Sequence, residues 1–198
     1  MDTTCLITVT FGVPQSAQNE LLKVRELLES QYVIKSRLAD PHITIYQCKV
    51  LQNDIESVIE ALQRIASEVG DIELVPTSVN IKNEYVGIKY QKSSSVERVH
   101  LKIVEALNKL RGDLVRSTYV EHRGLYSQTE QLYIDKYGYP YVMSEYSPHL
   151  ALIALEDRED AEKVKIENIS RFSFISPVLE VVIISNAGKE IKQLYFKK

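Results

Sequence analysis

Hydrophobic residues recur along the chain at two different spacings, and the changes between them predict a mixture of strands and helices. Short runs rich in β-branched residues are typical of buried strands, whereas apolar residues three or four positions apart indicate amphipathic helices. The expected helices cover about 17–32, 55–69, 94–111 and 156–167, the last of them short. The expected strands cover about 5–11, 42–48, 72–81, 85–91, 149–155, 172–185 and 190–197, with turns at 82–84 and 186–189.

Two segments of the chain begin in the same way and continue with the same order of elements. Pro41-His42-Ile43-Thr44-Ile45 and Pro148-His149-Leu150-Ala151-Leu152 each open a strand. Each strand is followed by a helix with acidic residues at its start, and then by two strands joined as a hairpin. We interpret this order as a duplicated β-α-β-β unit whose halves share little sequence identity.

The alternation of side chains along a strand determines which residues of each segment share a face. Successive side chains point to opposite faces of a sheet. The apolar residues after each histidine must pack against the helices, so the histidine faces open onto a groove or a second sheet. The residues expected on these faces are His42, Thr44 and Tyr46 in the first segment, and Ser147, His149 and Ala151 in the second.

Two histidines that face each other across a cleft can act as a general acid and a general base. If the two units pack about a pseudo-twofold axis, His42 and His149 meet in this way. One imidazole then takes a proton from an attacking hydroxyl or water, and the other protonates the departing oxygen at a phosphorus or carbonyl centre. Thr44 can donate a hydrogen bond to a phosphate oxygen. The alternative is that these histidines are capping or core residues; we expect His100 and His122 to be structural or surface residues.

The composition is that of a globular protein, and it restricts the kind of partner. The 24 basic and 27 acidic side chains give a formal net charge of −3, which argues against binding along long double-stranded nucleic acid. Neither HExxH nor CxxC occurs, and we expect no metal and no cofactor. The apolar stretches are too short to span a membrane. Cys5 and Cys48 lie among apolar residues, and without an export signal we expect buried, reduced thiols in a cytoplasmic, monomeric protein.

The two histidine segments resemble the motifs of the 2H phosphoesterase superfamily, whose members are also called 2′-5′ RNA ligase-like or LigT-like proteins. Members carry two His-x-Thr/Ser motifs flanked by hydrophobic residues, and their order of elements is similar over nearly the whole chain. The resemblance implies a bilobal α+β fold in which two antiparallel sheets face a central cleft and the helices lie outside. We expect one domain over 1–198, with one lobe at about 35–112 and the other at about 113–198 together with the N-terminal strand and helix.

The resemblance also implies the activity of a metal-independent phosphoesterase. Known members open 2′,3′-cyclic phosphates, hydrolyse or join 2′-5′ linkages, or process related cyclic nucleotides. By motif, His42 and His149 become the acid–base pair and Thr44 becomes a phosphate-binding hydroxyl. The expected partner is therefore a small nucleotide or an RNA end, with the hydrolase and ligase directions both open because the same groups serve both.

The second motif departs from the family pattern, because Ala151 stands where members have a hydroxyl. The loss of a donor of this kind lowers a rate by roughly 10²–10³. Three explanations are open. The catalyst is weakened but active, or Ser147 or a backbone N–H replaces the missing donor, or the chain is a nucleotide-binding module that no longer turns over.

Residues 113–147 show no clear period and contain seven of the twelve tyrosines. The segment ends next to the second motif, so we expect it to pass near the cleft and to supply stacking and phosphate contacts. Tyr139, Tyr146 and Arg123 are expected to contact the ligand, and Arg37 is a further candidate for a phosphate contact. The alternative is a loop or hairpin whose tyrosines pack against the protein with their hydroxyls in water.

Overall fold

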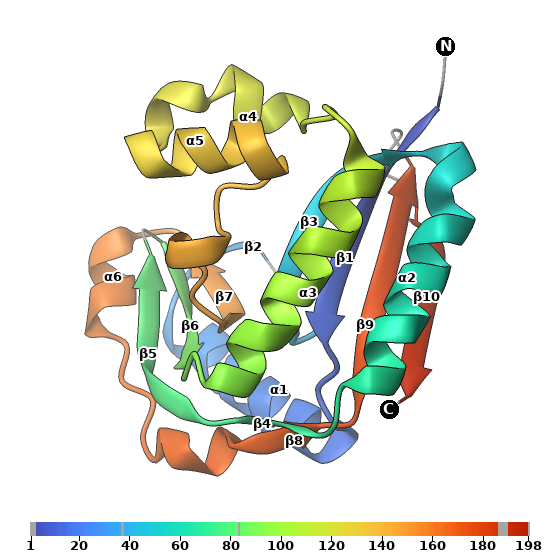
Figure 1. Ribbon diagram of the computed structural model, residues 1–198. Helices are drawn as coiled ribbons and strands as arrows, with labels where there is room; N and C mark the ends of the chain where they lie inside the picture. The colour runs from blue at the N-terminus through green and yellow to red at the C-terminus, as the bar shows by residue number, and fades with distance from the viewer. Residues whose placement is uncertain (1–2, 37, 83, 186–189, 198) are drawn as a thin grey trace.

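Figure 1 shows the computed structural model of the chain, in which residues 3–36, 38–82, 84–185 and 190–197 are described. Arg37 and the turn expected at 186–189 lie outside the described residues. The strands are β1 (Thr4–Phe11), β2 (Ile34–Ser36), β3 (Ile43–Leu51), β4 (Ile72–Leu74), β5 (Pro76–Lys82), β6 (Tyr85–Tyr90), β7 (His149–Leu155), β8 (Phe174–Ser176), β9 (Val178–Ser185) and β10 (Glu190–Lys197). The α-helices are α1 (Gln15–Gln31), α2 (Ile55–Glu68), α3 (Ser94–Arg111), α4 (Ser117–Glu121), α5 (Gln128–Tyr137) and α6 (Arg158–Lys163). Short 3₁₀ turns are η1 (Gln52–Asp54), η2 (Arg123–Leu125), η3 (Met143–Glu145) and η4 (Ile169–Phe172).

Most of the strands form one antiparallel sheet, in the order β10-β9-β1-β3-β7-β6-β5, with β2 also paired to β7. Helices α2 and α3 lie side by side in front of the part of the sheet that contains β1, β3, β9 and β10, and α1 lies behind the sheet, where it packs on β7 (Figure 1). Helix α6 packs on β6 and β7. The expected α+β class with antiparallel strands is confirmed.

Helix α3 illustrates why the predicted helices form. Ser93 caps its start by accepting a hydrogen bond from the backbone N–H of Val96, and Gly112 ends it with a φ of 58°. Its apolar residues recur every three or four positions and form one buried stripe against β3. The stripe consists of Val96, Val99, Ile103, Val104 and Leu107.

The strands of the two repeated units are exchanged between the two halves of the sheet. Strand β3 of the first unit pairs with β1 and lies on the side of the β9–β10 hairpin, whereas β7 of the second unit pairs with β6 of the β5–β6 hairpin. The lobe boundaries expected at 35–112 and 113–198 do not describe this pairing, because each half of the sheet takes strands from both segments. Sequence order alone does not reveal the exchange, since antiparallel strands select their partners through non-local packing.

A small second sheet also pairs a strand of one unit with a strand of the other. The strands expected at 72–81 and 172–185 are each divided, and the three-residue strands β4 and β8 pair with each other. Pro76 and Pro177 lie at the two divisions. Proline donates no backbone hydrogen bond, so it favours the end of one ladder and the start of another. Both units therefore have the order β-α-β-β-β, with one additional short strand each.

The two motif strands share an irregularity three residues after their histidine. The register of β3 against β1 leaves Ile45 without a partner residue, and the register of β7 against β6 leaves Leu152 without one. Each is a β-bulge, which adds one residue and shifts the alternation of side chains. The duplication therefore extends to the backbone geometry of the strands that carry the histidines.

The bulge in β3 corrects the expectation that Tyr46 shares a face with His42 and Thr44. Tyr46 pairs with Val9 and Thr44 pairs with Thr10, and adjacent residues of β1 point to opposite faces. Tyr46 is therefore buried on the face opposite to Thr44, where its hydroxyl donates to the backbone carbonyl of Tyr137.

The segment 113–147 is mostly helical, although its sequence shows no clear period. It contributes α4, η2, α5 and η3, and α4 and α5 lie beyond the end of α3 in Figure 1. Tyr119, Tyr139 and Tyr146 are buried, and the other four tyrosines of the segment are partly buried. Tyr139 makes edge contacts with the rings of Tyr46 and Tyr141, at centroid distances of 6.1 and 5.5 Å. Packing, the alternative considered for these tyrosines, is thus their main role in the fold.

Both cysteines are buried and free, as expected from their neighbours. Burial raises the pKa of the Cys48 thiol to about 12, so this side chain behaves as a small apolar residue at neutral pH. Across the described ranges, no helix combines the length and the apolar character that crossing a membrane requires.

Candidate active site

Each motif histidine is oriented by a backbone carbonyl two residues before it. The Nδ1 atom of His42 lies 2.8 Å from the carbonyl oxygen of Asp40, and the Nδ1 atom of His149 lies 2.9 Å from that of Ser147. A carbonyl oxygen can only accept, so Nδ1 of each ring carries the proton. This leaves Nε2 of both rings as the atom that exchanges a proton with a ligand, and it fixes the same tautomer at both motifs.

The two motifs meet at one point of the sheet. Ile43 of β3 pairs with Leu150 of β7, and both side chains are fully buried. Residues adjacent to this pair point to the opposite face, which places His42 and Thr44 on the same face as His149. Diagonal neighbours on one face of an antiparallel pair lie about 7–8 Å apart, a spacing that allows two side chains to hold one small group between them.

A cavity of about 510 Å³ opens on the β7 side of this meeting point. His149 lines it together with Ser147 and Ala151. The β5–β6 hairpin and the end of the 113–147 segment form the remaining walls. These walls consist of Asn80, Lys82, Tyr85, Val86, Gly87, Glu130, Tyr141 and Glu145. His42 and Thr44 are not among the lining residues, and they lie across the Ile43–Leu150 pair from it.

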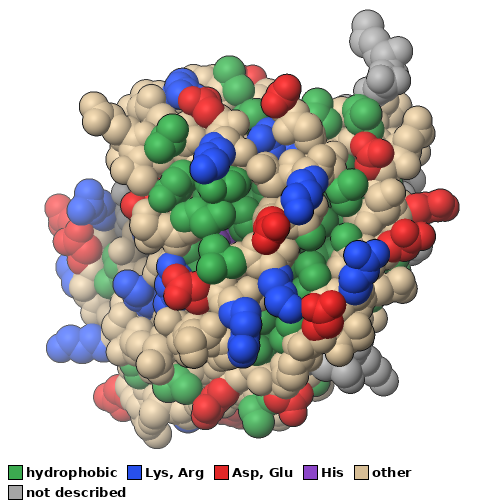
Figure 2. Space-filling view, in the orientation of Figure 1, with side chains coloured by type: hydrophobic (Ala, Val, Ile, Leu, Met, Phe, Trp, Pro, Cys, Tyr) green, Lys and Arg blue, Asp and Glu red, His purple; other side chains and the backbone are tan. Residues whose placement is uncertain are grey.

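The charged groups of the cavity are one lysine and two carboxylates. The Nζ atom of Lys82 lies 3.1 Å from the hydroxyl of Tyr141 and 4.2 Å from the centre of its ring, so Lys82 and Tyr141 form one unit of the wall. Glu130 and Glu145 add two negative charges. On the face shown in Figure 2, basic and acidic side chains are interspersed among those drawn, in keeping with the net charge of −3. Within the described ranges, no group of three or more His, Cys, Asp or Glu side chains could hold a metal ion.

The other residues predicted from the sequence divide into two groups. Ser147 and Ala151 line the cavity with His149. Tyr146 is 4% exposed and stacks on His100, Tyr139 is 8% exposed within the tyrosine cluster, and Arg123 makes a bidentate salt bridge with Asp135 at 2.7 Å. None of these last three residues lines the cavity. His100 is fully buried and structural, as expected, and His122 is exposed.

The sequence matches a family described as "Protein of unknown function (DUF1045)" over residues 50–182, which is more than half of the chain. The chain belongs to the DUF1045 family. The matched range contains the second motif with His149 and ends within β9, whereas His42 lies before it. No curated protein sequence matches this DUF1045 chain.

Solved structures similar to this DUF1045 chain include LigT of E. coli, a phosphoesterase and a PDE domain, and each matches it over nearly its whole length. LigT of E. coli in complex with 3′-AMP has a TM-score of 0.59 at 10% identity, covering 98% of this chain and 99% of that one. A structure described as a phosphoesterase has a TM-score of 0.59 at 11% identity, covering 100% of both chains. The PDE domain of MHV ns2 has a TM-score of 0.56 at 13% identity, covering 92% and 99%. At these identities the likeness concerns the fold, and it confirms the resemblance to the LigT-like fold of 2H phosphoesterases.

Several cavity residues of the DUF1045 chain were not predicted from the sequence. Lys82 falls in the turn expected at 82–84, and Glu130 and Glu145 belong to no sequence motif. They reach the second motif because the β5–β6 hairpin pairs with β7 and because α5 and η3 pack beside it. The capping box of α5, in which Ser127 and Glu130 exchange hydrogen bonds, is a local signal that could have located Glu130 at a helix start.

Gly87 permits the close approach of β6 to the second motif. A Cβ atom at this position would lie 2.0 Å from the carbonyl oxygen of Leu150 and 3.0 Å from Cα of Ala151. We expect Gly87→Ala to lower the free energy of unfolding by about 1–3 kcal/mol, because backbone rather than a flexible side chain must move. Urea denaturation measures this loss. Gly70→Ala is the matched control, since nothing lies within 4 Å of its Cβ position. An equal effect at both positions would contradict the steric explanation.

Proposed function

We propose that the chain is a metal-independent phosphoesterase in which His42 and His149 share proton transfer. The substrates we propose are the 2′,3′-cyclic phosphate end of RNA, a 2′-5′ phosphodiester linkage or a small cyclic nucleotide. The observation that carries the proposal is the pairing of Ile43 with Leu150, which brings the two histidine motifs to one face of the sheet. The similar structures described as a phosphoesterase and as a PDE domain add support.

The proposed reaction transfers one proton to the first imidazole and one proton from the second. One imidazole accepts the proton of the attacking water through its free Nε2, and the water oxygen forms a new bond to phosphorus. The other imidazole, protonated on both nitrogens, donates its Nε2 proton to the departing ester oxygen as that bond breaks. The orientation of both rings by a carbonyl at Nδ1 supports these roles, because it directs the same nitrogen of each ring toward the ligand.

The cavity beside His149 fits a single nucleoside better than a polyphosphate. Small-ligand sites commonly have volumes of roughly 300–1,000 Å³, and this cavity is about 510 Å³. Two carboxylates and one lysine leave its wall net negative, so a ligand with one charge near the histidine is favoured. Glu130 and Glu145 can accept hydrogen bonds from ribose hydroxyls or from the amino group of a base, and Tyr85 offers an exposed aromatic surface for stacking.

The decisive experiment supplies the purified protein with a panel of 2′,3′-cyclic, 3′,5′-cyclic and 2′-5′-linked nucleotides in the presence of EDTA. Turnover that survives EDTA and is lost in both His42→Ala and His149→Ala supports the proposal. Turnover that EDTA abolishes would contradict metal independence. Turnover that persists in both variants would remove the histidines from the mechanism.

A nucleotide-binding module without turnover is the second candidate, and Ala151 is the observation that favours it. An alanine at this position donates no hydrogen bond to a phosphate oxygen. In this case the nucleotides of the panel would raise the melting temperature of the protein and would be recovered unaltered. A protein that neither binds nor cleaves any member of the panel would exclude both candidates.

Ser147 is the side chain we propose as the substitute donor. It lines the cavity with His149, and no hydrogen bond of its hydroxyl is found among the described residues. We therefore expect Ser147→Ala to lower kcat by roughly 10²–10³-fold, and Ala151→Thr to restore most of this loss in the double variant while changing the wild-type rate little. The rates are measured on the best substrate of the panel. A large gain from Ala151→Thr alone would show instead that a donor is missing.

A further inference from the structure

Two buried polar side chains contact the bulges of the two motif strands. Arg25 on α1 is 4% exposed, and His100 on α3 is fully buried. The Nε atom of Arg25 donates to the carbonyl oxygen of Leu152 at 2.8 Å, and Nδ1 of His100 donates to that of Ile45 at 2.9 Å. These carbonyls belong to the extra residue of each bulge. Both side chains therefore bind the same backbone position of the duplicated unit.

Each of these side chains also binds the chain that leads to the histidine of the other motif. The two Nη atoms of Arg25 donate to the carbonyl oxygens of Leu38 and Ala39 at 3.3 and 2.8 Å. The next residue is Asp40, whose carbonyl orients His42. Arg25 thus connects the bulge of β7, in the second motif, with the approach to the first histidine.

His100 makes the corresponding connection from the first motif strand to the chain before the second histidine. Its Nε2 atom accepts a hydrogen bond from the backbone N–H of Met143 at 3.1 Å, four residues before Ser147, whose carbonyl orients His149. His100 thus connects the bulge of β3, in the first motif, with the approach to the second histidine. One donor and one acceptor in the same ring require the neutral form with the proton on Nδ1. Burial lowers the pKa of His100 to about 4, in agreement with a neutral ring at pH 7.

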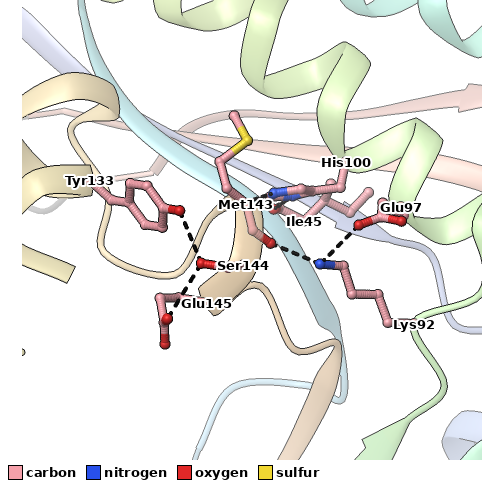
Figure 3. A network of polar contacts seen from close by, with 8 residues as sticks. All are labelled: Ile45, Lys92, Glu97, His100, Tyr133, Met143, Ser144 and Glu145. Atoms are coloured by element: carbon pink, nitrogen blue, oxygen red, sulfur yellow. Dashed lines mark hydrogen bonds and ion pairs between the residues drawn. The ribbon is translucent and has the colours of Figure 1, made fainter. Parts of the chain in front are cut away.

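The backbone at Met143 depends on this contact. Met143 has a φ of 54°, an unfavourable conformation for a residue with a side chain. Figure 3 shows how it is held: its N–H binds His100, and its carbonyl accepts from Nζ of Lys92 at 2.8 Å, which in turn pairs with Glu97. The ring of Tyr146 stacks on His100 at a centroid distance of 3.8 Å and an angle of 2°. The segment before His149 is therefore attached through Met143 and Tyr146 to His100 of α3, and through Met143 also to Lys92 just before this helix.

We propose that His100 and Arg25 are positioning residues that fix the two motif histidines relative to each other, each by tying the bulge of one motif strand to the chain that approaches the other histidine. The effect of these two residues on catalysis rests on the proposed function. Their structural effect, the orientation of the histidine rings, is measurable without turnover.

The test uses His100→Phe, which keeps an aromatic ring for the stack with Tyr146 and removes both hydrogen bonds. The ¹⁵N signals of the histidine rings report which nitrogen carries the proton. In the wild type we expect His42 and His149 to hold the proton on Nδ1, and in His100→Phe we expect His149 to shift toward the Nε2-protonated form that predominates in free histidine. If turnover is found, kcat falls by about 10- to 100-fold with KM within twofold, and the pH dependence of kcat shifts.

Val104→Ala is the matched control, since Val104 is buried on the same helix one turn after His100 and makes no polar contact with a motif. We expect it to lower the melting temperature without changing the ring signals of His149. His149 signals that are unchanged in His100→Phe, with only a loss of stability, would overturn the proposal.

Two further variants keep the test decisive. If His100→Phe does not fold, His100→Asn replaces it. Its amide extends as far as Nδ1 but not as far as Nε2, so it keeps the hydrogen bond to Ile45 and removes the one to Met143, together with the stack on Tyr146. The same shift at His149 is expected. Arg25→Met, of similar length and without a donor, should shift the ring signals of His42 in the corresponding way. A panel without turnover would refute the proposed function and leave these ring signals as the measure of positioning.

Discussion

Alanine at His42 or at His149 is expected to lower kcat by at least 100-fold in each case, on whichever nucleotide of the panel is cleaved. Positioned general acids and bases contribute roughly 10²–10⁴-fold each, and among the residues that line the cavity no histidine other than His149 could replace a lost ring. Substrate binding involves the walls of the cavity as well, so KM should change much less than kcat. Steady-state kinetics with each variant measures both quantities.

The double variant makes this prediction sharper. When two residues act as one unit, removing the second costs little after the first has been lost. We therefore expect His42→Ala/His149→Ala to be no more than about tenfold slower than either single variant. His122→Ala is the control, because His122 is an exposed histidine that does not line the cavity. Fully multiplicative losses in the double variant would indicate that the two rings act in separate steps or at separate sites.

The pH dependence of the single variants separates the acid from the base. A pair of histidines with opposite roles gives a bell-shaped dependence of kcat on pH. Without the base, the acidic side of the bell flattens, and without the acid, the basic side flattens. The sequence alone leaves this assignment open, because the roles depend on the orientation of the substrate. In the structure both rings have the same kind of backbone partner at Nδ1, so the variants must separate the two roles.

The local features of the candidate site could be predicted from the sequence. Pro41-His42 and Pro148-His149 occur at equivalent strand starts, and the alternation around Ile43 and Leu150 correctly separates the buried side from the histidine side. These features depend on residues close together along the chain. The helices at 55–69 and 94–111 were predictable for the same reason, since their apolar stripes are local.

The parts that could not be predicted depend on long-range pairing. The bulge at Ile45 places Tyr46 on the opposite face, and a bulge leaves no mark in the hydrophobic pattern of a strand with buried residues on both sides. The exchange of hairpins brings Lys82 to the second motif. The tyrosines of 113–147 are amphipathic, so their composition fits packing and ligand contact equally well, and only the fold distinguishes Tyr139 from Tyr141.

Thr44→Val is expected to lower kcat by about 10²–10³-fold, the loss typical of a donor to developing negative charge. Thr44 lies on the face of His149, its side chain is partly exposed, and no hydrogen bond of its hydroxyl is found among the described residues. Valine keeps the shape and β-branching of threonine, so β3 should retain its stability and its register. The loss should appear in kcat, because the donor acts mainly on the charge that develops in the transition state.

Thr44→Ser decides whether the hydroxyl or the shape of Thr44 matters. Serine retains the donor and loses only a methyl group, so a rate within about tenfold of the wild type is expected, well above that of the valine variant. Thr77→Val on β5 is the control, because Thr77 is an exposed strand threonine whose hydroxyl donates to the carbonyl of Lys89 and lies outside the cavity. If Thr44→Val kept the wild-type kcat, Ser147 or the backbone would have to supply every hydrogen bond to the phosphate. The two motifs would then contribute only their histidines, and Ala151 would no longer count as a departure that affects the rate.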